Sequence, residues 1–532
     1  RQKLAFIIRM IKKELEKLVE EAGAKAGIDL SKVLISESEF GDYSTQAALT
    51  IKNGKKPSEN SQAIIKNLPQ NKIIVKMKEK NGFINFYLSN QFLGESVKNI
   101  LKDKESFGKN NNFKNKKIQV EFVSANPTGP LHLGNARGGP LGDAIASILE
   151  ASGAKVEREF YVNDIGSQAE HFGKTLLYWQ KKSAGDKVEF PEKGYPGAYM
   201  QEISNKIADS DDVKKLVKDG INQMMTEIRA TLSRMGIKYD KFIYESEIFS
   251  SGKTQKVIDV LVDKGRTLVR EEAIWLDDSV LVRSDKDKTL TYFANDIAYH
   301  KDKFDRGFDE AIDIWGSAHH GHIVRLKSAL SHLGIKSERL KIILYQFVRL
   351  KHGDKIEKMA KRKGTYITAD QVLSAVGRDA FRMMMLLNSP NTHLDFDLEL
   401  AKKESSENPV YYLQYVSARI SGILRKIPNP KSQIPNKISN LKYENKFELA
   451  LIKELIKFPD LVSEISRSYE VHHLPHYGIS LAKKFHQFYK NCPVIRAENE
   501  EVKKSRIVLI KATQIVLKNT LNLLGISAPD KM

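Results

Sequence analysis

The sequence has little cysteine: Cys492 is the only one among 532 residues. Intrachain disulfides and zinc sites built from several cysteines are therefore excluded, and a reducing compartment is expected, here the cytoplasm. No run of about 18 apolar residues occurs, so no membrane-spanning segment is predicted. No signal-peptide pattern is present either, and because the sequence begins at Arg1 we expect a few native residues to precede it.

Acidic residues are in deficit: 86 Lys and Arg stand against 66 Asp and Glu, a net charge of +20. This excess favours a polyanionic partner such as nucleic acid, although solvated lysine-rich faces explain it equally well. The length predicts roughly two to four domains, and no internal repeat is present.

Hydrophobic patterning divides the chain into three regions. Residues 1–108 read as an α+β unit, residues 109–376 alternate strands with helices, and residues 377–532 read as a helical bundle. The polar stretch Lys181–Lys264 reads as an insertion. Strands are predicted at Ile118–Val123, Val156–Val162 and Ala311–Trp315, and helices at Ala136–Ala151, His322–His332, Arg382–Leu387, Tyr411–Lys426, Phe447–Ile465, Tyr477–Asn491 and Val502–Leu524.

The segment Val120–Gly139 reads as a strand, a loop and the start of a helix. Free backbone N–H groups and the helix dipole at such a junction suit a polyphosphate. His132 and Asn135 can face one ligand there, and Gly134 leaves room for a flat ring to approach the backbone.

A second segment of interest is the basic stretch Gly353–Tyr366, which holds five cations between two glycines. A loop of this kind can close over a triphosphate and neutralise the charge on leaving pyrophosphate. Taken alone, an exposed charged loop is the better interpretation, and only the pairing with the His132 segment reverses that preference. The cations are Lys355, Lys358, Lys361, Arg362 and Lys363.

Two other signals are weak. Gly173-Lys-Thr175 evokes a phosphate loop, but Gln168 stands where the first glycine is needed. The histidine clusters lack carboxylate or cysteine support at a known metal-binding spacing, so no metal site is predicted. These clusters are His319, His320 and His322, and His472, His473 and His476.

The segment around His132 and the basic segment Gly353–Tyr366, in this order, resemble the signature motifs of class I aminoacyl-tRNA synthetases. Further segments narrow the resemblance to the arginyl-tRNA synthetase family. The similarity spans the chain, with Asn135, Ala318 and Ala360 as departures from the family pattern. The similar segments are Phe40–Ala48, Gly82–Asn85, Ser124–His132, Tyr292–His300, Phe304–Phe308, Ile314–His322, Lys358–Arg362, Leu386–Asp397, Asn408–Tyr415 and Leu524–Met532.

The resemblance implies a Rossmann-type parallel-sheet catalytic domain at 109–376, an additional N-terminal tRNA-contacting α+β domain at 1–108, and an anticodon-binding α-helical bundle at 377–532. It implies that arginine and ATP, with Mg²⁺, form arginyl-adenylate, and that the arginyl group then moves to the 2′-hydroxyl of the terminal adenosine of tRNA. His132, Asn135, Lys358 and Lys361 would be catalytic, and His132, Gly134, Asn135 and Lys361 would bind ATP.

Carboxylates suit a guanidinium, and the resemblance places Asp296 and Glu121 in the arginine pocket. From the residues alone, Asp296 reads as a surface charge on a helix, whereas Glu121 on an apolar strand is expected to be buried beside a cation. The implied arginine-binding residues are Glu121, Ser124, Asn126, Tyr292, Asp296 and His320.

Tyr412, Tyr415 and Arg419 share one helical face and could stack unpaired bases, although buried tyrosines in a bundle are equally compatible. The resemblance favours anticodon contact there and near Met532. Phe40, Tyr43 and Phe83 are candidates for tRNA contact in the N-terminal unit, with packing inside a small domain as the alternative.

Two alternatives stay open at this point. One is a class I synthetase for another amino acid, of which cysteine is nearest in architecture, although the cysteine zinc ligands are missing. The other is a non-catalytic tRNA-binding paralogue, motivated by Asn135 and Ala318. The protein is expected to be a monomer.

Overall fold

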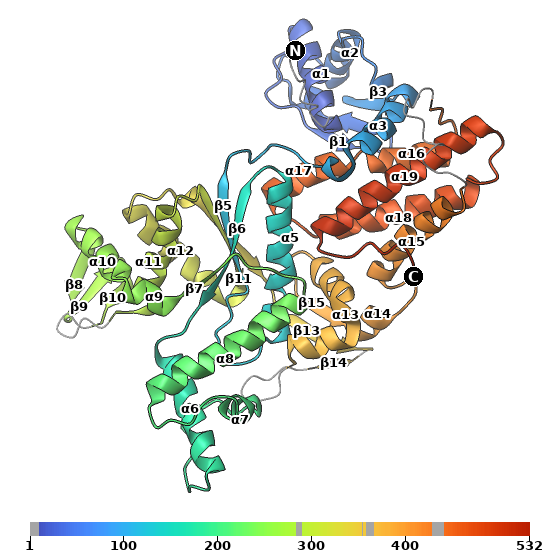
Figure 1. The fold of residues 1–532 in the computed structure, drawn as a ribbon. Coiled ribbons are helices and arrows are strands. Elements are labelled where there is room, and N and C mark those ends of the chain that lie inside the picture. Colours follow the sequence, from blue (N-terminus) through green and yellow to red (C-terminus); the bar gives the residue numbers. More distant parts are fainter. Residues whose placement is uncertain (1–9, 284–289, 354, 358–366, 428–440) are drawn as a thin grey trace, which may run out of the picture.

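The structure is a computed structural model that describes residues 10–283, 290–353, 355–357, 367–427 and 441–532. Figure 1 shows a parallel sheet at the centre, an α+β unit around the N-terminus and a group of helices towards the C-terminus. The predicted fold class, with these three kinds of architecture in this order, is confirmed.

The N-terminal unit contains an antiparallel sheet with strand order β1-β2-β4-β3. The apolar stripe of its first helix is buried, as Ile11, Leu15 and Val19 show. The unit comprises α1 (Ile11–Lys25), β1 (Ile35–Glu37), β2 (Tyr43–Thr45), a short 3-10 helix (Ala47–Thr50), α2 (Pro57–Lys66), β3 (Ile74–Lys80), β4 (Phe83–Leu88) and α3 (Asn90–Asp103).

The central sheet has five parallel strands in the order β12-β11-β5-β6-β7. Helices cover the sheet, and Val120, Phe160 and Ile312 of its inner strands have no exposed surface. Helix α5 packs against β5, β6 and β11, while α11 and α12 pack against the β11–β12 side. The bounds are β5 (Lys117–Phe122), α4 (Leu133–Ala136), α5 (Gly138–Ala151), β6 (Lys155–Val162), β7 (Lys241–Tyr244), α11 (Tyr292–Asp305), β11 (Glu310–Gly316), α12 (His320–His332) and β12 (Leu340–Tyr345).

The interpretation of Lys181–Lys264 as an insertion is partly wrong. Its strand β7 is the edge strand of the central sheet and pairs in parallel with β6. Most of the added structure instead lies on either side of β7. It consists of α6 (Ser167–Ser183), α7 (Tyr199–Ser204), α8 (Val213–Arg234), α9 (Glu245–Ser250), α10 (Lys253–Asp263) and a small antiparallel sheet of β8 (Thr267–Arg270), β9 (Ala273–Leu276) and β10 (Ser279–Val282).

A further small sheet, ordered β14-β13-β15, links the central sheet to the C-terminal helices. Helix α13 is kinked at Gly377, whose φ of 78° is left-handed and suits glycine. The elements are β13 (Val348–His352), β14 (Lys355–Glu357), α13 (Ala369–Leu386), β15 (Leu394–Asp397) and α14 (Leu398–Lys402).

The C-terminal region is helical as predicted, but the single helix expected at Phe447–Ile465 is two helices. Pro459 has no N–H to continue the hydrogen bonds of a preceding turn, and a new helix begins at Phe458. The helices are α15 (Pro409–Arg425), α16 (Lys446–Leu455), α17 (Phe458–Ser468), α18 (His473–Asn491) and α19 (Glu500–Leu523).

The N-terminal unit rests on the C-terminal helices, with α3 against α16 and α19 (Figure 1). Three ion pairs cross this boundary: Lys12–Glu464 at 2.7 Å, Lys453–Asp42 at 2.6 Å and Lys457–Glu37 at 2.7 Å.

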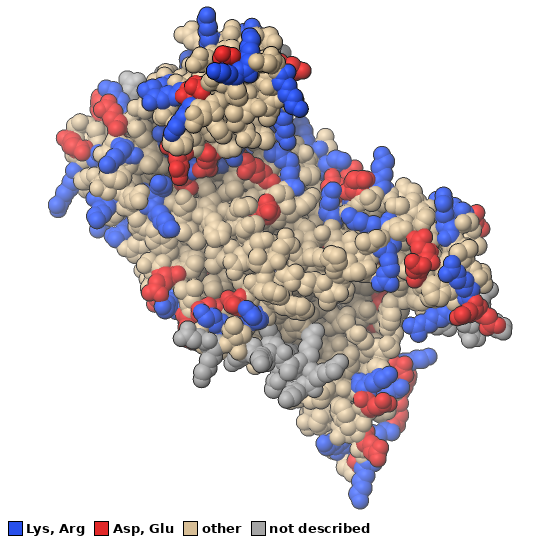
Figure 2. Space-filling view, turned by 180° about the vertical axis from the view of Figure 1, so that it is seen from behind, with Lys and Arg blue, Asp and Glu red and all other residues tan. Residues whose placement is uncertain are grey.

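Positive charge is spread over the surface. In the view of Figure 2, Lys and Arg lie mainly over the outlying lobes, and the middle of this face is largely uncharged. The net charge therefore does not by itself mark one binding face on this side. Among the described residues no helix combines the length and apolar character needed to cross a membrane.

Candidate active site

A cavity of about 1450 Å³ lies at the carboxyl ends of the parallel strands. Residues at or just after the ends of β5, β6, β11 and β12 line it, together with parts of α4, α11 and α12. Open parallel sheets bind ligands in this kind of crevice, and the volume can hold a nucleotide and an amino acid together.

One end of the cavity is formed by the start of α4. His132 is the N-cap residue, and its Nδ1 accepts a hydrogen bond from the backbone N–H of Asn135 at 3.2 Å. A neutral His132 therefore carries its proton on Nε2. Gly134 between them leaves space for the imidazole, because a Cβ there would lie 3.0 Å from Cε1 of His132 and the ring would have to shift. All three residues line the cavity.

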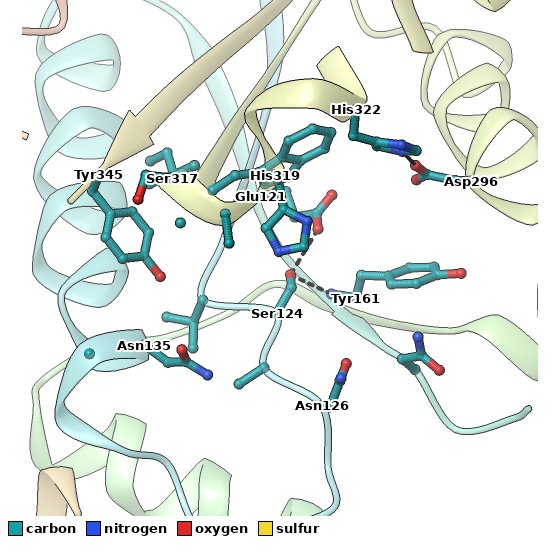
Figure 3. A pocket seen from close by; sticks show the side chains of 18 of the residues that line it. Glu121, Ser124, Asn126, Asn135, Tyr161, Asp296, Ser317, His319, His322 and Tyr345 are labelled. Carbon is teal, nitrogen blue, oxygen red and sulfur yellow. Dashed lines mark hydrogen bonds and ion pairs between the residues drawn. The ribbon is translucent and has the colours of Figure 1, made fainter. Parts of the chain in front are cut away.

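A left-handed turn ends β5 and directs the chain along the cavity. The predicted strand extended to Val123, but Val123 and Ser124 have φ values of 70° and 35°, which are unfavourable for residues other than glycine. Ser124 Oγ donates to Glu121 Oε1 at 2.8 Å and accepts from the Tyr161 backbone N–H at 3.1 Å (Figure 3). These bonds hold the turn, and Asn126 beyond it also lines the cavity.

Glu121 is buried beside a cation, as expected from its place on an apolar strand. Its Oε2 accepts from Lys303 Nζ at 2.7 Å and from the Tyr299 hydroxyl at 2.9 Å. Lys303 also contacts Asp313 Oδ1 at 2.7 Å, and neither side chain is exposed. Burial raises the pKa of Glu121, and the Lys303 ammonium opposes that rise.

Asp296 lines the cavity and is not a plain surface charge. Its carboxylate contacts His322 Nε2 on one side and His300 Nδ1, at 3.1 Å, on the other. Burial raises the pKa of Asp296, but the two histidines outweigh burial and hold it well below its usual range. Burial and Lys303 lower the pKa of His300, yet Asp296 and Asp313 outweigh them and raise it to about 10.

Tyr292 begins α11 and lies across the mouth of the cavity, where it is 44% exposed. Its hydroxyl accepts from the Ser167 backbone N–H at 2.9 Å. Gly166 makes this approach possible, since a Cβ there would lie 2.0 Å from the hydroxyl oxygen. Asn126 donates to Gln168 Oε1 at 2.7 Å on the same side. The first turn of α6 thus holds Tyr292 and Asn126.

His320 does not line the cavity, contrary to the expectation for an arginine-pocket residue. It is exposed, whereas His319 and His322 on either side of it line the cavity. The phase of α12 explains this, because Leu326 and Ala329 are buried on the turns that follow His322. That apolar phase was the signal that could have selected His322.

Sequence reasoning also missed Glu245, a buried carboxylate of the cavity wall. It follows the last residue of β7, and its Oε1 accepts from Asn295 Nδ2 at 2.9 Å. Burial raises the pKa of Glu245 to about 7. The carboxyl-end rule for parallel strands would have found Glu245 if β7 had been recognised. Tyr161, Trp315 and Tyr345 were missed as lining residues too.

Lys358 and Lys361 lie outside the described residues. The strand that leads to them is described: β14 ends at Glu357 and pairs antiparallel with β13. Ile356 of this strand lines the cavity, so the chain reaches the cavity rim just before Lys358.

The predicted RNA-facing residues differ in exposure. Tyr43 is 3% exposed and belongs to the core of the N-terminal unit, so direct tRNA contact by its side chain is contradicted. Phe40 is 56% exposed, with Lys80 Nζ 3.4 Å from its ring centre, and Phe83 is 38% exposed. Packing of the small domain explains Tyr43 but not Phe40.

On α15, Tyr412 and Tyr415 are half-buried, with ring centres 5.0 Å and 6.0 Å from His486. The exposed guanidinium of Arg419 lies 5.2 Å from the Tyr415 ring centre. Met532 is exposed, and Ser421 donates to Asp530 at 2.8 Å, which ties the C-terminal tail to α15.

Comparison with known proteins agrees with this fold and cavity. The model of the class I (R) tRNA synthetase catalytic domain matches residues 96–397, so the fold and the site are those of a class I aminoacyl-tRNA synthetase. The arginyl tRNA synthetase N-terminal domain matches residues 5–88, and the DALR anticodon-binding domain matches residues 413–532. The chain belongs to the arginyl-tRNA synthetase family.

The relatives are similar over nearly their whole length. An arginine–tRNA ligase of Desulforamulus reducens is 38% identical over 99% of this chain and 100% of its own. That of Ruminiclostridium cellulolyticum is 40% identical over 96% of each chain. The solved arginyl-tRNA synthetase of Thermus thermophilus shares the fold, with a TM-score of 0.79 at 22% identity, covering 98% of this chain and 100% of that chain.

Proposed function

We propose that the chain ligates arginine to its cognate tRNA in two steps, of which the first consumes ATP. An arginine carboxylate oxygen attacks the α-phosphorus of ATP, which forms arginyl-adenylate and releases pyrophosphate. The 2′-hydroxyl oxygen of the terminal adenosine then attacks the carbonyl carbon, which forms the ester and releases AMP. One observation carries the proposal: a single cavity has the His132–Asn135 helix start at one end and the carboxylates Glu121 and Asp296 at the other.

In the first step, the nucleotide end positions the phosphates and balances their charge. His132 donates from Nε2 and Asn135 from its side-chain amide. Lys358 and Lys361, which follow β14 in the sequence, would neutralise charge on the leaving pyrophosphate. Mg²⁺ binds through the ATP phosphates rather than through a dedicated protein cage. Catalysis is then mainly orientation and electrostatic stabilisation.

The amino-acid end recognises arginine. Asp296 and Glu121 supply negative charge for the guanidinium, and Tyr292 closes the mouth of the cavity. Asn126 holds the α-amino group, and Ser124 keeps the turn that brings Asn126 forward. This assignment explains why buried cations accompany the carboxylates: the site keeps its shape and charge balance before the ligand arrives.

For tRNA, we propose contact through exposed aromatic and basic groups of both terminal regions. Phe40 and Phe83 are available in the N-terminal unit. Tyr412, Tyr415 and Arg419 form an aromatic and cationic face on α15, and Met532 lies at the end of the tail tied to that helix. We further propose that the protein acts as a monomer in the cytoplasm, with residues 1–108, 109–376 and 377–532 as its domains. Light scattering with and without tRNA tests the monomer.

Amino-acid-dependent exchange of pyrophosphate into ATP tests the activity. The assay is run with arginine, cysteine and lysine, each with and without tRNA. We expect exchange with arginine only, since the relatives are arginine–tRNA ligases and the cavity presents carboxylates. Exchange with cysteine or lysine would indicate another synthetase. No exchange with any of the three in the presence of tRNA would indicate a binding-only protein.

A further inference from the structure

Asp296 is held from two sides by histidines that differ in mobility. His300 is 1% exposed, and its Nε2 contacts Asp313 Oδ2 at 2.7 Å while its Nδ1 faces Asp296. His322 comes from α12, lines the cavity, and has a side chain that is 22% exposed. In Figure 3 the His322 imidazole points directly at the Asp296 carboxylate. Of the two, His322 is the one that can leave without breaking the buried charge network.

His322 occupies the place that an arriving cation needs. A guanidinium is recognised best when both carboxylate oxygens are available for paired hydrogen bonds. Here His322 Nε2 is hydrogen-bonded to Oδ2, whereas His300 Nδ1 is hydrogen-bonded to the Asp296 backbone carbonyl at 2.7 Å and lies 3.1 Å from Oδ1. Because His300 is fixed, a guanidinium entering from the cavity meets Asp296 at the oxygen that His322 holds.

We propose that His322 is a built-in competitor for the arginine site, which holds Asp296 in the empty cavity and yields it to the guanidinium. This inference rests on the proposed function, because it takes arginine as the ligand of Asp296. Exchange of one hydrogen-bond donor for another keeps the carboxylate paired throughout.

The surroundings of His322 show that Asp296 is its polar partner. The charged or titratable groups around it are Asp296 on α11, with His300 behind it, and His319 and Arg325 from its own chain segment. The rings of Phe293 and Trp315 lie beside it, with centres 5.4 Å and 5.9 Å away. Removal of the imidazole should therefore free Asp296 Oδ2 and raise the affinity for arginine.

Isothermal calorimetry of arginine binding to the full-length wild type and to His322→Gln at one pH tests this. Glutamine can still donate to Asp296 but never carries a charge. We expect the variant to bind arginine about 3- to 10-fold more tightly than the wild type, the effect of weakening one competing contact.

His332→Gln is the matched control, since His332 ends the same helix and contacts Asp277 instead. His322→Phe is a second variant that keeps a ring beside Trp315 but cannot donate. It should also bind arginine more tightly than the wild type. Trp315 emission gives a separate signal: arginine should change it more in the wild type than in His322→Gln, because only the wild type moves an imidazole ring that lies 5.9 Å from the Trp315 ring.

The outcomes separate the two proposals. If the wild type binds arginine and both His322 variants bind it equally or more weakly, His322 supports the ligand and the inference is wrong. If His332→Gln strengthens arginine binding as much as His322→Gln does, the effect does not come from the Asp296 contact and the inference is also wrong. If the folded wild type binds no arginine, with or without tRNA, the proposed function itself fails.

Discussion

The two ends of the cavity are built in different ways. The end that we assign to the nucleotide comes from one short segment, in which His132 caps α4 by accepting a hydrogen bond from the Asn135 backbone N–H. The amino-acid end combines β5, α11, β11 and α12 through buried charges, among them Glu121, Lys303 and Asp313. A local segment can be read from a sequence motif, whereas a charge network assembled from distant elements needs the fold. The variants below test whether the two ends also differ in stability and function.

The largest effect is expected from Lys303→Met, which removes the cation shared by Glu121 and Asp313. The loss leaves Glu121 with hydroxyl donors alone and Asp313 with His300 alone, which should lower the free energy of unfolding by about 3–5 kcal/mol. The measurement is urea denaturation followed by tryptophan fluorescence. Lys301→Met is the control, because Lys301 pairs only with the exposed Asp305. Equal urea midpoints for the two variants would show that the network does not hold the amino-acid end together.

Asp296→Asn should raise the arginine KM by about 30- to 150-fold, corresponding to about 2–3 kcal/mol for a lost charged hydrogen bond. The ATP KM should stay within about twofold, because Asp296 lies at the other end of the cavity. Pyrophosphate exchange measures both constants. Asp305→Asn changes the same residue type at the end of α11 and serves as the control. Parallel increases in both constants would mean that the two ends are not independent.

The difference between the ends also explains what the sequence could predict. The strand–loop–helix segment was readable because its apolar periodicity and its Gly and Pro residues act locally. Burial of Glu121 beside a cation was predictable from its strand, but its partner Lys303 was not, because helix α11 brings it from far along the chain. The resemblance supplied Asp296, which the residues alone had indicated to be a surface charge.

The errors have physical causes as well. The edge strand β7 is short and follows a polar helical region, so neither it nor Glu245 stood out. The phase of α12 separates His322 from His320, because Leu326 and Ala329 are buried on the turns that follow His322. For Tyr43 the sequence left tRNA contact and packing inside the small domain as alternatives, and its burial in the core of the N-terminal unit favours packing.

Glu245→Gln should stabilise the protein at neutral and alkaline pH. Burial raises the pKa of Glu245 to about 7 from a model-compound value of 4.5, so the folded state favours the protonated acid. The wild type therefore loses stability as the pH rises from about 4.5 to 7, and glutamine does not. The variant should be more stable by about 1–3 kcal/mol at about pH 8 and equal at about pH 4. Urea denaturation at both values measures this difference, and a stability gain that is the same at both would contradict the assigned cause.

The smallest effect is expected from Gly134→Ala at the nucleotide end. The new Cβ would lie 3.0 Å from Cε1 of His132, so the ring must shift by a few tenths of an ångström. We expect the ATP KM to rise about tenfold, because a small misplacement of a positioning group weakens contacts with the phosphates. Arginine affinity and the urea midpoint should not change. The side chain that a Cβ at Gly134 would meet is His132, which is not part of the buried charge network.

Gly422→Ala is the control for that variant, because a Cβ at Gly422 meets only Arg425, at 3.7 Å, in a helix remote from the cavity. A small change at the nucleotide end should thus weaken ATP binding without changing the stability of the protein. Changes at the amino-acid end should instead affect arginine binding or stability. If Gly134→Ala lowered arginine affinity as much as it raised the ATP KM, the His132 turn would have to communicate with Asp296. The two ends of the cavity would then be coupled in binding, although the nucleotide end is built from one short segment of the sequence.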